Sequence, residues 1–419
     1  MSAPTSCQID TTAAIGFRGR EYSATKTVNG RTKSAGDTRR LIQPWLTRAG
    51  ITRLANVTGL DRLGVPVVLA IRPAGQTLSA NAGKGLDMAS AWVSAAMEAI
   101  EVFHAESAAP DLRRLSWREM ERRRPVLEAE RVALKADCEL NVDWAHDWML
   151  GWDLLAQQEI AVPFGIISLA YSRACYDFRI FQSSSNGLAS GNHLLEAVLA
   201  GMLEAIERDA ITCHTVLHGT NQPPVIDIAE LAGGPLGDLL SMLQEKGVAA
   251  YLLDYTGHLG IPVVKAYLVD RLQPELGIYH GHAAALSTTE ACLKATLEAV
   301  QSRAVYIAGS RDDMFQEVFS CRRDRRNVRA LAGRLAALPA QPLIHRNLGT
   351  PTLEGDIGVL LDGLKRGNIR QAAVVDLSQP GWPVHVVKVV IPGLEGYITP
   401  QYVAGSLLTE RIRGAQCAA

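Results

Sequence analysis

Three stretches of the chain repeat one spacing of apolar and polar residues, and the polar residues could bind a cation. In each stretch, three apolar side chains accompany two acidic or amide side chains at identical offsets. The polar pairs are Glu98 with Glu101, Glu204 with Glu207, and Glu298 with Gln301. On a helix, at about 100° per residue, the apolar positions form one packing stripe and the polar pair projects beside it. Paired glutamates repel each other when both are ionised, so we expect something cationic between them.

Carboxylate oxygens are the hard ligands that Mg²⁺ prefers, and Mg²⁺ in turn bridges nucleotide phosphates. The second helix carries a further carboxylate, Glu196, which lies about 20° from Glu207 in projection. The alternative is that each pair belongs to a solvated face, because glutamate is a good helix former. Three copies in one frame favour the metal interpretation, since a duplicated solvent face has no reason to keep both positions acidic or amidic.

Glycine-bearing segments at residues 81–85 and 186–192 enter the first two helices. Their backbone N–H groups could approach an anion at a helix N-terminus, although glycine before a helix is usually turn chemistry. Neither segment matches the Walker pattern of a P-loop. After the third helix, Arg303 and Arg311 could clamp phosphate oxygens, but Arg311 next to two aspartates could equally form a local ion pair.

Alternating strands and helices must position these residues. Short β-branched runs alternate with longer helical patterns from residue 51 onward, which predicts an α/β (α+β) fold. The clearest predicted strands cover residues 67–71, 248–253, 261–269, 374–377 and 384–391, and a predicted helix covers residues 236–246. Residues 1–40 are polar and rich in turns, so we expect a partly ordered arm. No low-complexity linker divides the chain, and one large domain is expected.

Composition excludes several classes of protein. Of 419 residues, 42 are Lys or Arg and 43 are Asp or Glu, so no overall field points to nucleic acid or an anionic membrane. The seven cysteines are scattered without a C-x-x-C pair, which argues against a disulfide framework or a structural zinc site. The N-terminus lacks a signal-peptide pattern, and no apolar run reaches the ~20 residues of a spanning helix. We expect a soluble, cytoplasmic protein.

The same residues carry a resemblance to the YcaO family. Its successive signatures are similar to Gly83-Lys84-Gly85 with Ser94-x-x-x-Glu98-x-x-Glu101, to Asn186-Gly187-Leu188-Ala189 with Glu204-Ala205-Ile206-Glu207-Arg208-Asp209-Ala210, and to Gln301-x-Arg303 with Ser310-Arg311-Asp312-Asp313. The resemblance extends from residue 51 to residue 402. It implies a single large YcaO-type domain of pseudo-repeated helix and strand units, which binds ATP through glutamate-lined magnesium sites instead of a P-loop. The implied organisation is an N-terminal arm at residues 1–50 that contributes to the nucleotide site, the YcaO domain at 51–405 and a C-terminal tail at 406–419.

The resemblance also assigns roles by position. The implied magnesium ligands are Glu98, Glu101, Glu196, Glu204 and Glu207. The implied nucleotide contacts are Asn192 and Arg208, Arg31 and Thr38 in the arm, and Gln301, Arg303 and Arg311 in the third signature. The first signature usually ends in Glu-Arg, whereas here Val102 follows the second glutamate, which removes one cation near the site and leaves the glutamates intact.

Family members activate a peptide-bond carbonyl oxygen with ATP, a chemistry that needs no protein nucleophile, so we assign no catalytic residue. The nucleophile decides the product: sulfide gives a thioamide, a Cys, Ser or Thr side chain gives an azoline, and an amine gives an amidine. Azoline-forming members often end in a proline-rich tail, which residues 413–419 do not resemble. Residues 50–61 and 392–397 look most like members paired with a TfuA partner, which implies thioamidation.

Two other functions stay open at this stage. One is azoline formation by cyclodehydration of a ribosomal peptide, and the other is a non-catalytic peptide-binding scaffold. The implied partners are a peptide or protein substrate and a TfuA-like protein, with a homodimer as one possible assembly and no nucleic acid or membrane partner.

Overall fold

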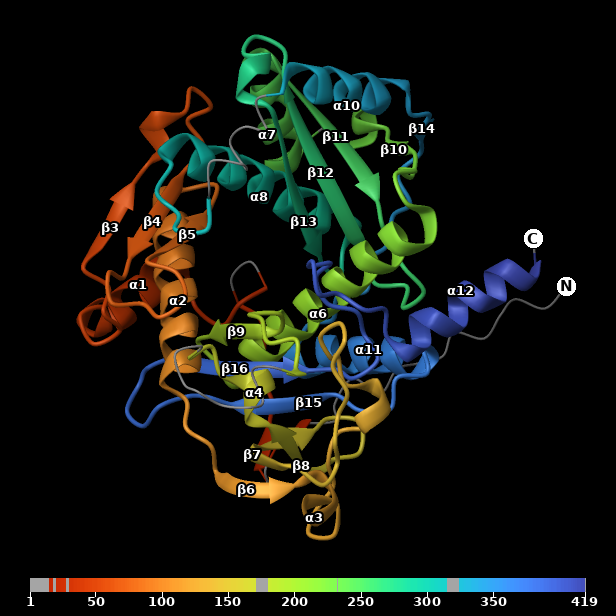
Figure 1. Ribbon diagram of the computed structural model, residues 1–419. Coiled ribbons are helices and arrows are strands. Elements are labelled where there is room, and N and C mark those ends of the chain that lie inside the picture. The colour runs from red at the N-terminus through yellow and green to blue at the C-terminus, as the bar shows by residue number, and fades with distance from the viewer. Residues whose placement is uncertain are drawn as a thin grey trace, which may run out of the picture.

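The strands of the protein form separate sheets that are joined by long helices. The computed structural model describes residues 15–17, 20–27, 30–170, 180–231, 233–314 and 324–418. In the view of Figure 1, one sheet forms the base of the molecule and two others stand above it on either side. Within the described residues no helix has both the length and the apolar character needed to cross a membrane.

The base sheet has the order β6-β7-β15-β16-β9, with β8 paired to β7. Its strands are β6 (Leu112–Ser116), β7 (Ala145–Asp153), β8 (Gln158–Pro163), β9 (Leu188–Gly191), β15 (Ala373–Asp376) and β16 (His385–Val390). Antiparallel pairing places late strands beside early ones, because β16 lies between β15 and β9. The strands predicted at residues 374–377 and 384–391 are therefore confirmed.

Two smaller sheets stand above the base. The first, with the order β3-β4-β5, consists of β3 (Arg53–Asn56), β4 (Val67–Ile71) and β5 (Ala80–Lys84). The second, with the order β13-β12-β11-β10-β14, consists of β10 (Val225–Ile226), β11 (Val248–Asp254), β12 (Val263–Asp270), β13 (Ile278–Ala284) and β14 (Ala340–Gln341). A separate hairpin pairs β1 (Ile15–Phe17) with β2 (Arg20–Tyr22). The remaining predicted strands are thus confirmed as β4, β11 and β12.

The helices range from one turn to seven. They are α1 (Ala35–Ile42), α2 (Met88–Ser107), α3 (Trp117–Glu121), α4 (Phe164–Ile167), α6 (Leu194–His218), α7 (Gly234–Glu245), α8 (Thr288–Ala308), α10 (Arg325–Ala337), α11 (Leu353–Arg366) and α12 (Ser406–Ala418). The predicted helix at residues 236–246 corresponds to α7. The three stretches with the repeated polar pairs lie within α2, α6 and α8, as expected.

Three strand–helix units repeat along the chain. In each unit a short turn connects a strand to a long helix: β5 leads into α2, β9 into α6, and β13 into α8. Each helix also contacts the strand of the next unit, because α2 touches β9, α6 touches β13 and α8 touches β5. The units therefore close head to tail into a ring, and Figure 1 shows the three helices around a common centre.

Glycines in these strands let the helices pack closely. A Cβ atom at Gly83 of β5 would lie 2.0 Å from the backbone nitrogen of Ala95 on α2. In the equivalent place, a Cβ at Gly281 of β13 would lie 2.4 Å from the nitrogen of Ala299 on α8. Real side chains do not tolerate such distances, so both positions require glycine for packing. Residues 81–85, whose glycines could serve either anion binding or a turn, are largely strand β5, and Gly83 is needed there for packing.

Candidate functional site

Paired polar residues on the three ring helices bind the neighbouring strands. Ser190 of β9 donates a hydrogen bond from its hydroxyl to Glu101 Oε1 on α2, with an O···O distance of 2.6 Å. The backbone N–H of Ala284, at the end of β13, donates to Glu207 Oε2 on α6 at 3.3 Å. Gln301 on α8 donates from Nε2 to the carbonyl oxygen of Ala82 on β5 at 2.7 Å.

These contacts occupy the same position in each unit. Glu101, Glu207 and Gln301 are the second members of the repeated pairs, and each bonds to the strand of the next unit. Glu101 and Glu207 accept hydrogen bonds from the next strand, whereas Gln301 donates one, so the group on the strand decides whether an acid or an amide fits. The second position of the repeat therefore joins the units, and the first position, three residues earlier on the same face, points toward the same region.

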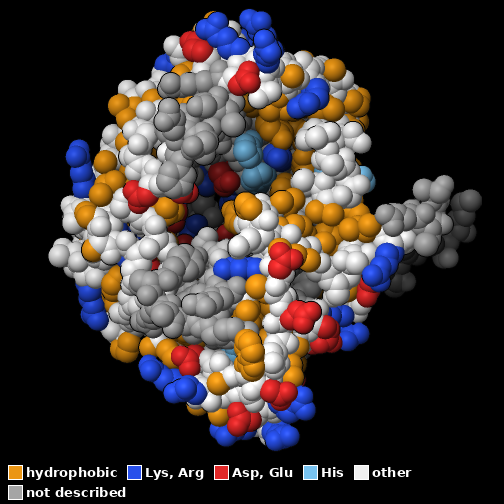
Figure 2. Space-filling model, viewed as in Figure 1, with side chains coloured by type: hydrophobic (Ala, Val, Ile, Leu, Met, Phe, Trp, Pro, Cys, Tyr) orange, Lys and Arg blue, Asp and Glu red, His pale blue; other side chains and the backbone are white. Residues whose placement is uncertain are grey.

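The first members of the pairs are Glu98, Glu204 and Glu298. Together with Glu101 and Glu207 they form a group of five carboxylates, which we call the glutamate ring. Figure 2 shows a hollow where the three units meet, in which acidic, basic and histidine side chains gather. Two cations pair with the ring: Lys84 Nζ lies 3.2 Å from Glu298 Oε2, and Arg208 Nη1 lies 2.9 Å from Glu207 Oε1.

Burial dominates the protonation of four of the five carboxyl groups. It raises the pKa of Glu98 to about 7 and that of Glu101 to about 8, well above the usual 4.5. Burial and the neighbouring carboxylates also raise the pKa values of Glu204 and Glu207, against the opposing charge of Arg208. The ring thus holds more acidic groups than its cations can keep ionised near neutral pH.

Glu298 behaves in the opposite way. Burial would raise the pKa of its carboxyl, but Lys84, His282 and Arg208 together hold the value well below its usual range. The side chain therefore stays ionised and anchors the cations of the ring. Arg208 is also stacked on Tyr397, with its guanidinium carbon 4.2 Å from the ring centroid.

The ring suits a divalent cation by its donor chemistry. Carboxyl groups from several helices interact with one another, and burial raises the pKa values of four of them. In the described part of the chain no three His, Cys, Asp or Glu side chains already converge as a metal site. The carboxylates would therefore have to lose protons and turn toward a metal ion as it binds.

Comparison with known proteins agrees with this donor set. Residues 82–395 match the family model described as YcaO cyclodehydratase, ATP- and Mg²⁺-binding. The chain belongs to the YcaO family. Membership of this family confirms ATP and Mg²⁺ as the predicted cofactors. Together with the helix and strand content, it also confirms the predicted mixed fold.

Two relatives of this YcaO protein cover nearly its whole length. An uncharacterised protein in the tfuA 3′ region of Rhizobium leguminosarum bv. trifolii is 35% identical over 390 residues, 90% of this chain and 91% of the relative. An uncharacterised protein of Methanothermobacter thermautotrophicus is 31% identical over 375 residues, 85% of this chain and 93% of the relative.

Two solved structures share the fold. The YcaO protein of Methanopyrus kandleri, bound with AMPPCP and Mg²⁺, has a TM-score of 0.68 and 21% identity, and the match covers 88% of this chain and 93% of that one. A heterocyclase in complex with substrate and cofactor has a TM-score of 0.78 and 20% identity. That match covers 93% of this chain and 55% of the heterocyclase, so the heterocyclase is the longer chain.

Glu196, the fifth predicted magnesium ligand, lies apart from the ring. Glu196 is in the first turn of α6, about 12 Å along the helix axis from Glu204. It accepts hydrogen bonds from the backbone N–H of Asn192 at 2.7 Å and from the backbone and hydroxyl groups of Thr32. Burial would raise the pKa of Glu196, but the bonds from Thr32 and Asn192 and the charge of Arg31 hold it below the usual value.

The N-terminal arm is docked on this end of α6. Thr38 lies on α1 and is 3% exposed, and its hydroxyl is 3.0 Å from Asn192 Oδ1 and 2.9 Å from the Ser34 carbonyl. Arg31 is exposed beside Glu196. Helix α1 begins at Ala35, between Arg31 and Thr38. The first 14 residues of the predicted arm lie outside the described residues.

The third signature divides between two environments. Gln301 occupies the second position of the repeated pair on α8 and binds β5. Arg303, by contrast, is 1% exposed and pairs through Nε with Asp61 at 2.8 Å and through Nη1 with Asp270 at 2.9 Å. Arg303 is therefore part of a buried ion-pair network, which argues against its predicted contact with the nucleotide. Arg311 pairs with Asp313, which is the local ion pair considered above, while its charge also acts on Glu98.

Sequence reasoning missed several residues of the site. Glu298 was recognised in the repeated frame but was not assigned to the metal site, although it lies closest to Lys84. Lys84 and His282 were not assigned either, because each lies on a strand, β5 or β13, and meets Glu298 only through tertiary packing. The signal for Glu298 was in the sequence, since it occupies the same position as Glu98 and Glu204.

Proposed function

We propose that this protein uses ATP and Mg²⁺ to activate backbone amides of a ribosomally made peptide or protein, and that with a TfuA-like partner it replaces the carbonyl oxygen by sulfur. The observation that carries the amide-activating part is the glutamate ring within a YcaO domain, with four carboxyl groups whose pKa values are raised by burial. The choice of sulfur is supported by the relative from the tfuA 3′ region, which is similar over 90% of this chain.

In this proposal the ring residues Glu98, Glu101, Glu204 and Glu207 hold magnesium, with Glu196 contributing from the first turn of α6. Bound magnesium would supply positive charge against the phosphate oxygens. The nucleotide would be contacted by two groups of residues: Arg208, Asn192, Gln301 and Arg311 of the domain, and Arg31 and Thr38 of the arm. We propose residues 1–50 as the arm, 51–405 as the catalytic domain and 406–419 as a tail.

The proposed reaction balances without a protein nucleophile. A hydrosulfide ion adds to the amide carbon, and the carbonyl electron pair moves onto oxygen. That oxygen attacks the γ-phosphorus of substrate ATP, and ADP leaves with the electrons of the broken P–O bond. The C–O bond then breaks, phosphate carries away the original oxygen and the S–H proton, and a thioamide remains. The charge that develops on the transferring phosphoryl oxygens is what cations at the ring would stabilise.

A second candidate is azoline formation. The family model bears the description of a cyclodehydratase, and a heterocyclase shares the fold. In that reaction a Cys, Ser or Thr side chain of the peptide takes the place of hydrosulfide, and the peptide loses water. Both reactions move the amide oxygen to phosphate, so ATP consumption alone does not distinguish them.

Mass spectrometry of the product distinguishes them. The protein is incubated with ATP, Mg²⁺, sulfide, the TfuA-like partner and synthetic peptides encoded next to the gene. Phosphoryl-transfer activation followed by sulfur exchange should raise the peptide mass by about 16 daltons, whereas cyclodehydration lowers it by about 18 daltons. Oxygen-18 in the target amide should appear in phosphate in both cases. A mass loss without sulfide would replace thioamidation by azoline formation, and unlabelled phosphate would refute amide activation.

A further inference from the structure

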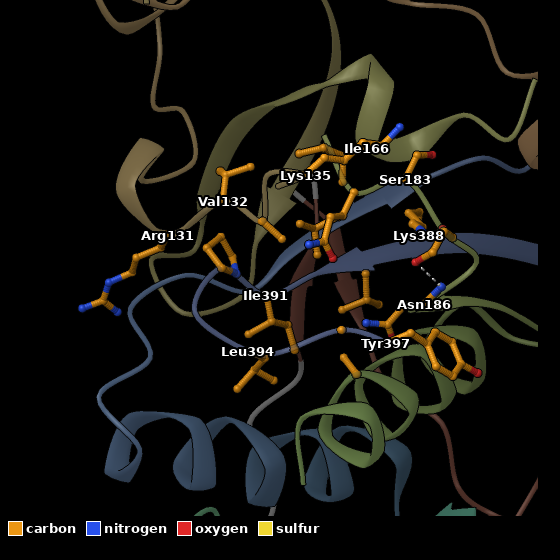
Figure 3. Close-up of a pocket in the computed structure, with 18 of the residues that line it drawn as sticks. Arg131, Val132, Lys135, Ile166, Ser183, Asn186, Lys388, Ile391, Leu394 and Tyr397 are labelled. Atoms are coloured by element: carbon orange, nitrogen blue, oxygen red, sulfur yellow. Dashed lines mark hydrogen bonds between the residues drawn. The ribbon is translucent and has the colours of Figure 1, made fainter. Parts of the chain in front are cut away.

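A cavity of about 570 Å³ lies beside the glutamate ring, on the side of the base sheet. Its walls are residues 131–135, residues 182–186 and residues 388–401, and Figure 3 shows their side chains around a common space. A second cavity of about 280 Å³ shares lining residues with the first, among them Arg131, Lys135, Gln182 and Leu394, so the two form one groove. The volume lies in the range of roughly 300–1,000 Å³ that is typical of ligand sites.

Lys388 lies at the ring end of this groove. It belongs to the base-sheet strand β16, is 2% exposed and is followed and preceded by valines. Its Nζ donates a hydrogen bond to the carbonyl oxygen of Ser184, and within the described residues no carboxylate lies within ion-pair distance of it. Burying an ammonium group without a paired anion is costly, so a strand position of this kind is unusual without a function.

The electrostatic neighbour of Lys388 is the ring itself. The charge of Glu204 opposes the effect of burial on the pKa of Lys388, and the charge of Lys388 in turn opposes the larger effect of burial, which raises the pKa of Glu204. Tyr397 makes a second connection, because it lines the cavity and also stacks on Arg208. One end of the groove is therefore continuous with the residues that would hold the metal and the phosphates.

The lining of the cavity suits a peptide main chain. Its polar side chains include neutral amides and hydroxyls such as Gln182, Ser183 and Asn186, interspersed with Val132, Ile166 and Leu394. Neutral donors and acceptors match the alternating C=O and N–H groups of a peptide, and the apolar groups match its side chains. Asn186 Oδ1 has no hydrogen-bond partner among the described residues, which leaves an acceptor for an amide N–H.

We propose that this cavity holds the peptide segment whose amide is activated, and that Lys388 donates a hydrogen bond to the carbonyl oxygen of that amide. The inference rests on the proposed amide activation. As the nucleophile adds, negative charge develops on this oxygen, and a preorganised ammonium group stabilises it. The same placement holds the oxygen next to Glu204 and hence next to the γ-phosphate bound at the ring. Lys388 keeps its proton throughout and makes no covalent bond.

Two variants test the two parts of the proposal. Lys388→Met keeps the length of the side chain and removes the ammonium group, whereas Ser183→Trp fills the cavity. Lys388→Arg is the conservative variant. Lys265→Met is the matched control, because Lys265 is a half-buried lysine on β12 that packs near Tyr267 and does not line the cavity. Each variant is measured for AMPPCP–Mg²⁺ affinity by calorimetry and for peptide conversion by mass spectrometry, with the peptide that the wild-type protein modifies.

We expect Lys388→Met to reduce kcat for peptide conversion about 100-fold, as for the loss of one donor to a developing oxyanion, with the KM for peptide and the AMPPCP affinity nearly unchanged. Lys388→Arg should recover part of the activity, Ser183→Trp should abolish peptide binding alone, and Lys265→Met should convert peptide at the wild-type rate. Wild-type conversion by Lys388→Met would overturn the role of Lys388, as would loss of AMPPCP binding, which would make Lys388 a nucleotide contact.

The failure of the proposed function has a separate signature. If the wild-type protein binds AMPPCP but converts no peptide, amide activation is refuted. The cavity assignment is then read from the binding of a fluorescein-labelled pool of the same synthetic peptides. Weaker binding to Ser183→Trp than to wild type would support the cavity as the peptide site, and equal binding would overturn it.

Discussion

Helix α8 carries two groups of charged residues that are organised in opposite ways. On one side is Glu298 of the glutamate ring, and five residues later, about 140° around the helix, is Arg303 of the ion-pair network. In the network, Arg303 and Arg62 face Asp61 and Asp270 at N···O distances of 2.7 to 2.9 Å. The ring has five carboxylates and two close cations, Lys84 and Arg208.

The protonation of the two groups shows what this difference means. The arginines and backbone N–H groups around Asp270 hold its pKa below the usual value against burial, whereas burial raises the pKa of four ring glutamates. A balanced set of buried charges maintains the fold, and an unbalanced set has capacity left for a ligand. The comparison predicts that substitutions in the network change stability, while substitutions in the ring change binding.

The largest effect is expected for Arg303→Met. This change leaves the buried Asp61 without its ion-pair partner, while Asp270 keeps Arg62, and breaking such a buried pair costs about 3–5 kcal/mol of unfolding free energy. Urea denaturation of the ligand-free protein measures it. The control is Glu101→Gln, which keeps the bond to Ser190 and should have little effect. A stable Arg303→Met protein that no longer binds AMPPCP would instead support Arg303 as a nucleotide contact.

The second effect is on ligand affinity. Glu207→Gln keeps the shape of the side chain and its acceptor for Ala284 N–H but removes a charge from the ring. We expect the affinity for AMPPCP–Mg²⁺ to fall by about 10- to 100-fold, as for other residues that support a metal site. The melting temperature of the ligand-free protein should stay equal or rise, since one buried carboxyl group is gone. Unchanged affinity would contradict the assignment of the ring as the metal site.

The third prediction concerns pH. The folded protein keeps protons on Glu98 and Glu101 up to pH values of about 7 and 8, whereas the unfolded chain releases them near 4.5. The folded state therefore binds more protons in this window, and the unfolding free energy of the ligand-free protein should fall as pH rises from about 5 to 8. Denaturation at several pH values measures the slope. The Glu98→Gln, Glu101→Gln double variant should be flatter, and an equal slope would show that other groups dominate.

The smallest effect is expected at the other end of α6, where Glu196 is a satisfied carboxylate. Thr38→Val removes a hydroxyl from the contact between α1 and Asn192 and should cost about 1 kcal/mol of unfolding free energy, the usual contribution of one hydrogen bond. Because the arm is docked through Thr32 and Thr38, amide exchange of residues 34–42 should be slow before nucleotide is added. Fast exchange that slows only with AMPPCP–Mg²⁺ would favour an arm that closes on the nucleotide.

The sequence predicted the three helices of the site and the equivalent positions of their glutamates. A repeated spacing in three helices places Glu98, Glu204 and Glu298 in equivalent positions, because helical geometry follows from local spacing alone. Partners of the ring glutamates come from strands of other units, as Ser190 does for Glu101 and Lys84 for Glu298. Such long-range contacts leave no local pattern in the sequence. For the same reason, the sequence could not show that Gln301 contacts β5 of the next unit while Arg303, two residues later, pairs with Asp61 and Asp270.

Gly83 and Gly281 affect how precisely the glutamates of the ring are positioned. A methyl group at Gly83 or Gly281 would overlap backbone atoms of α2 or α8. The close contact at each glycine therefore fixes the distance between the strand and its helix. Productive phosphoryl transfer tolerates misplacement of about 0.5 Å. An alanine at either position would shift a whole helix by more than that. The precision of the site is therefore set in part by two side chains that consist of a hydrogen atom.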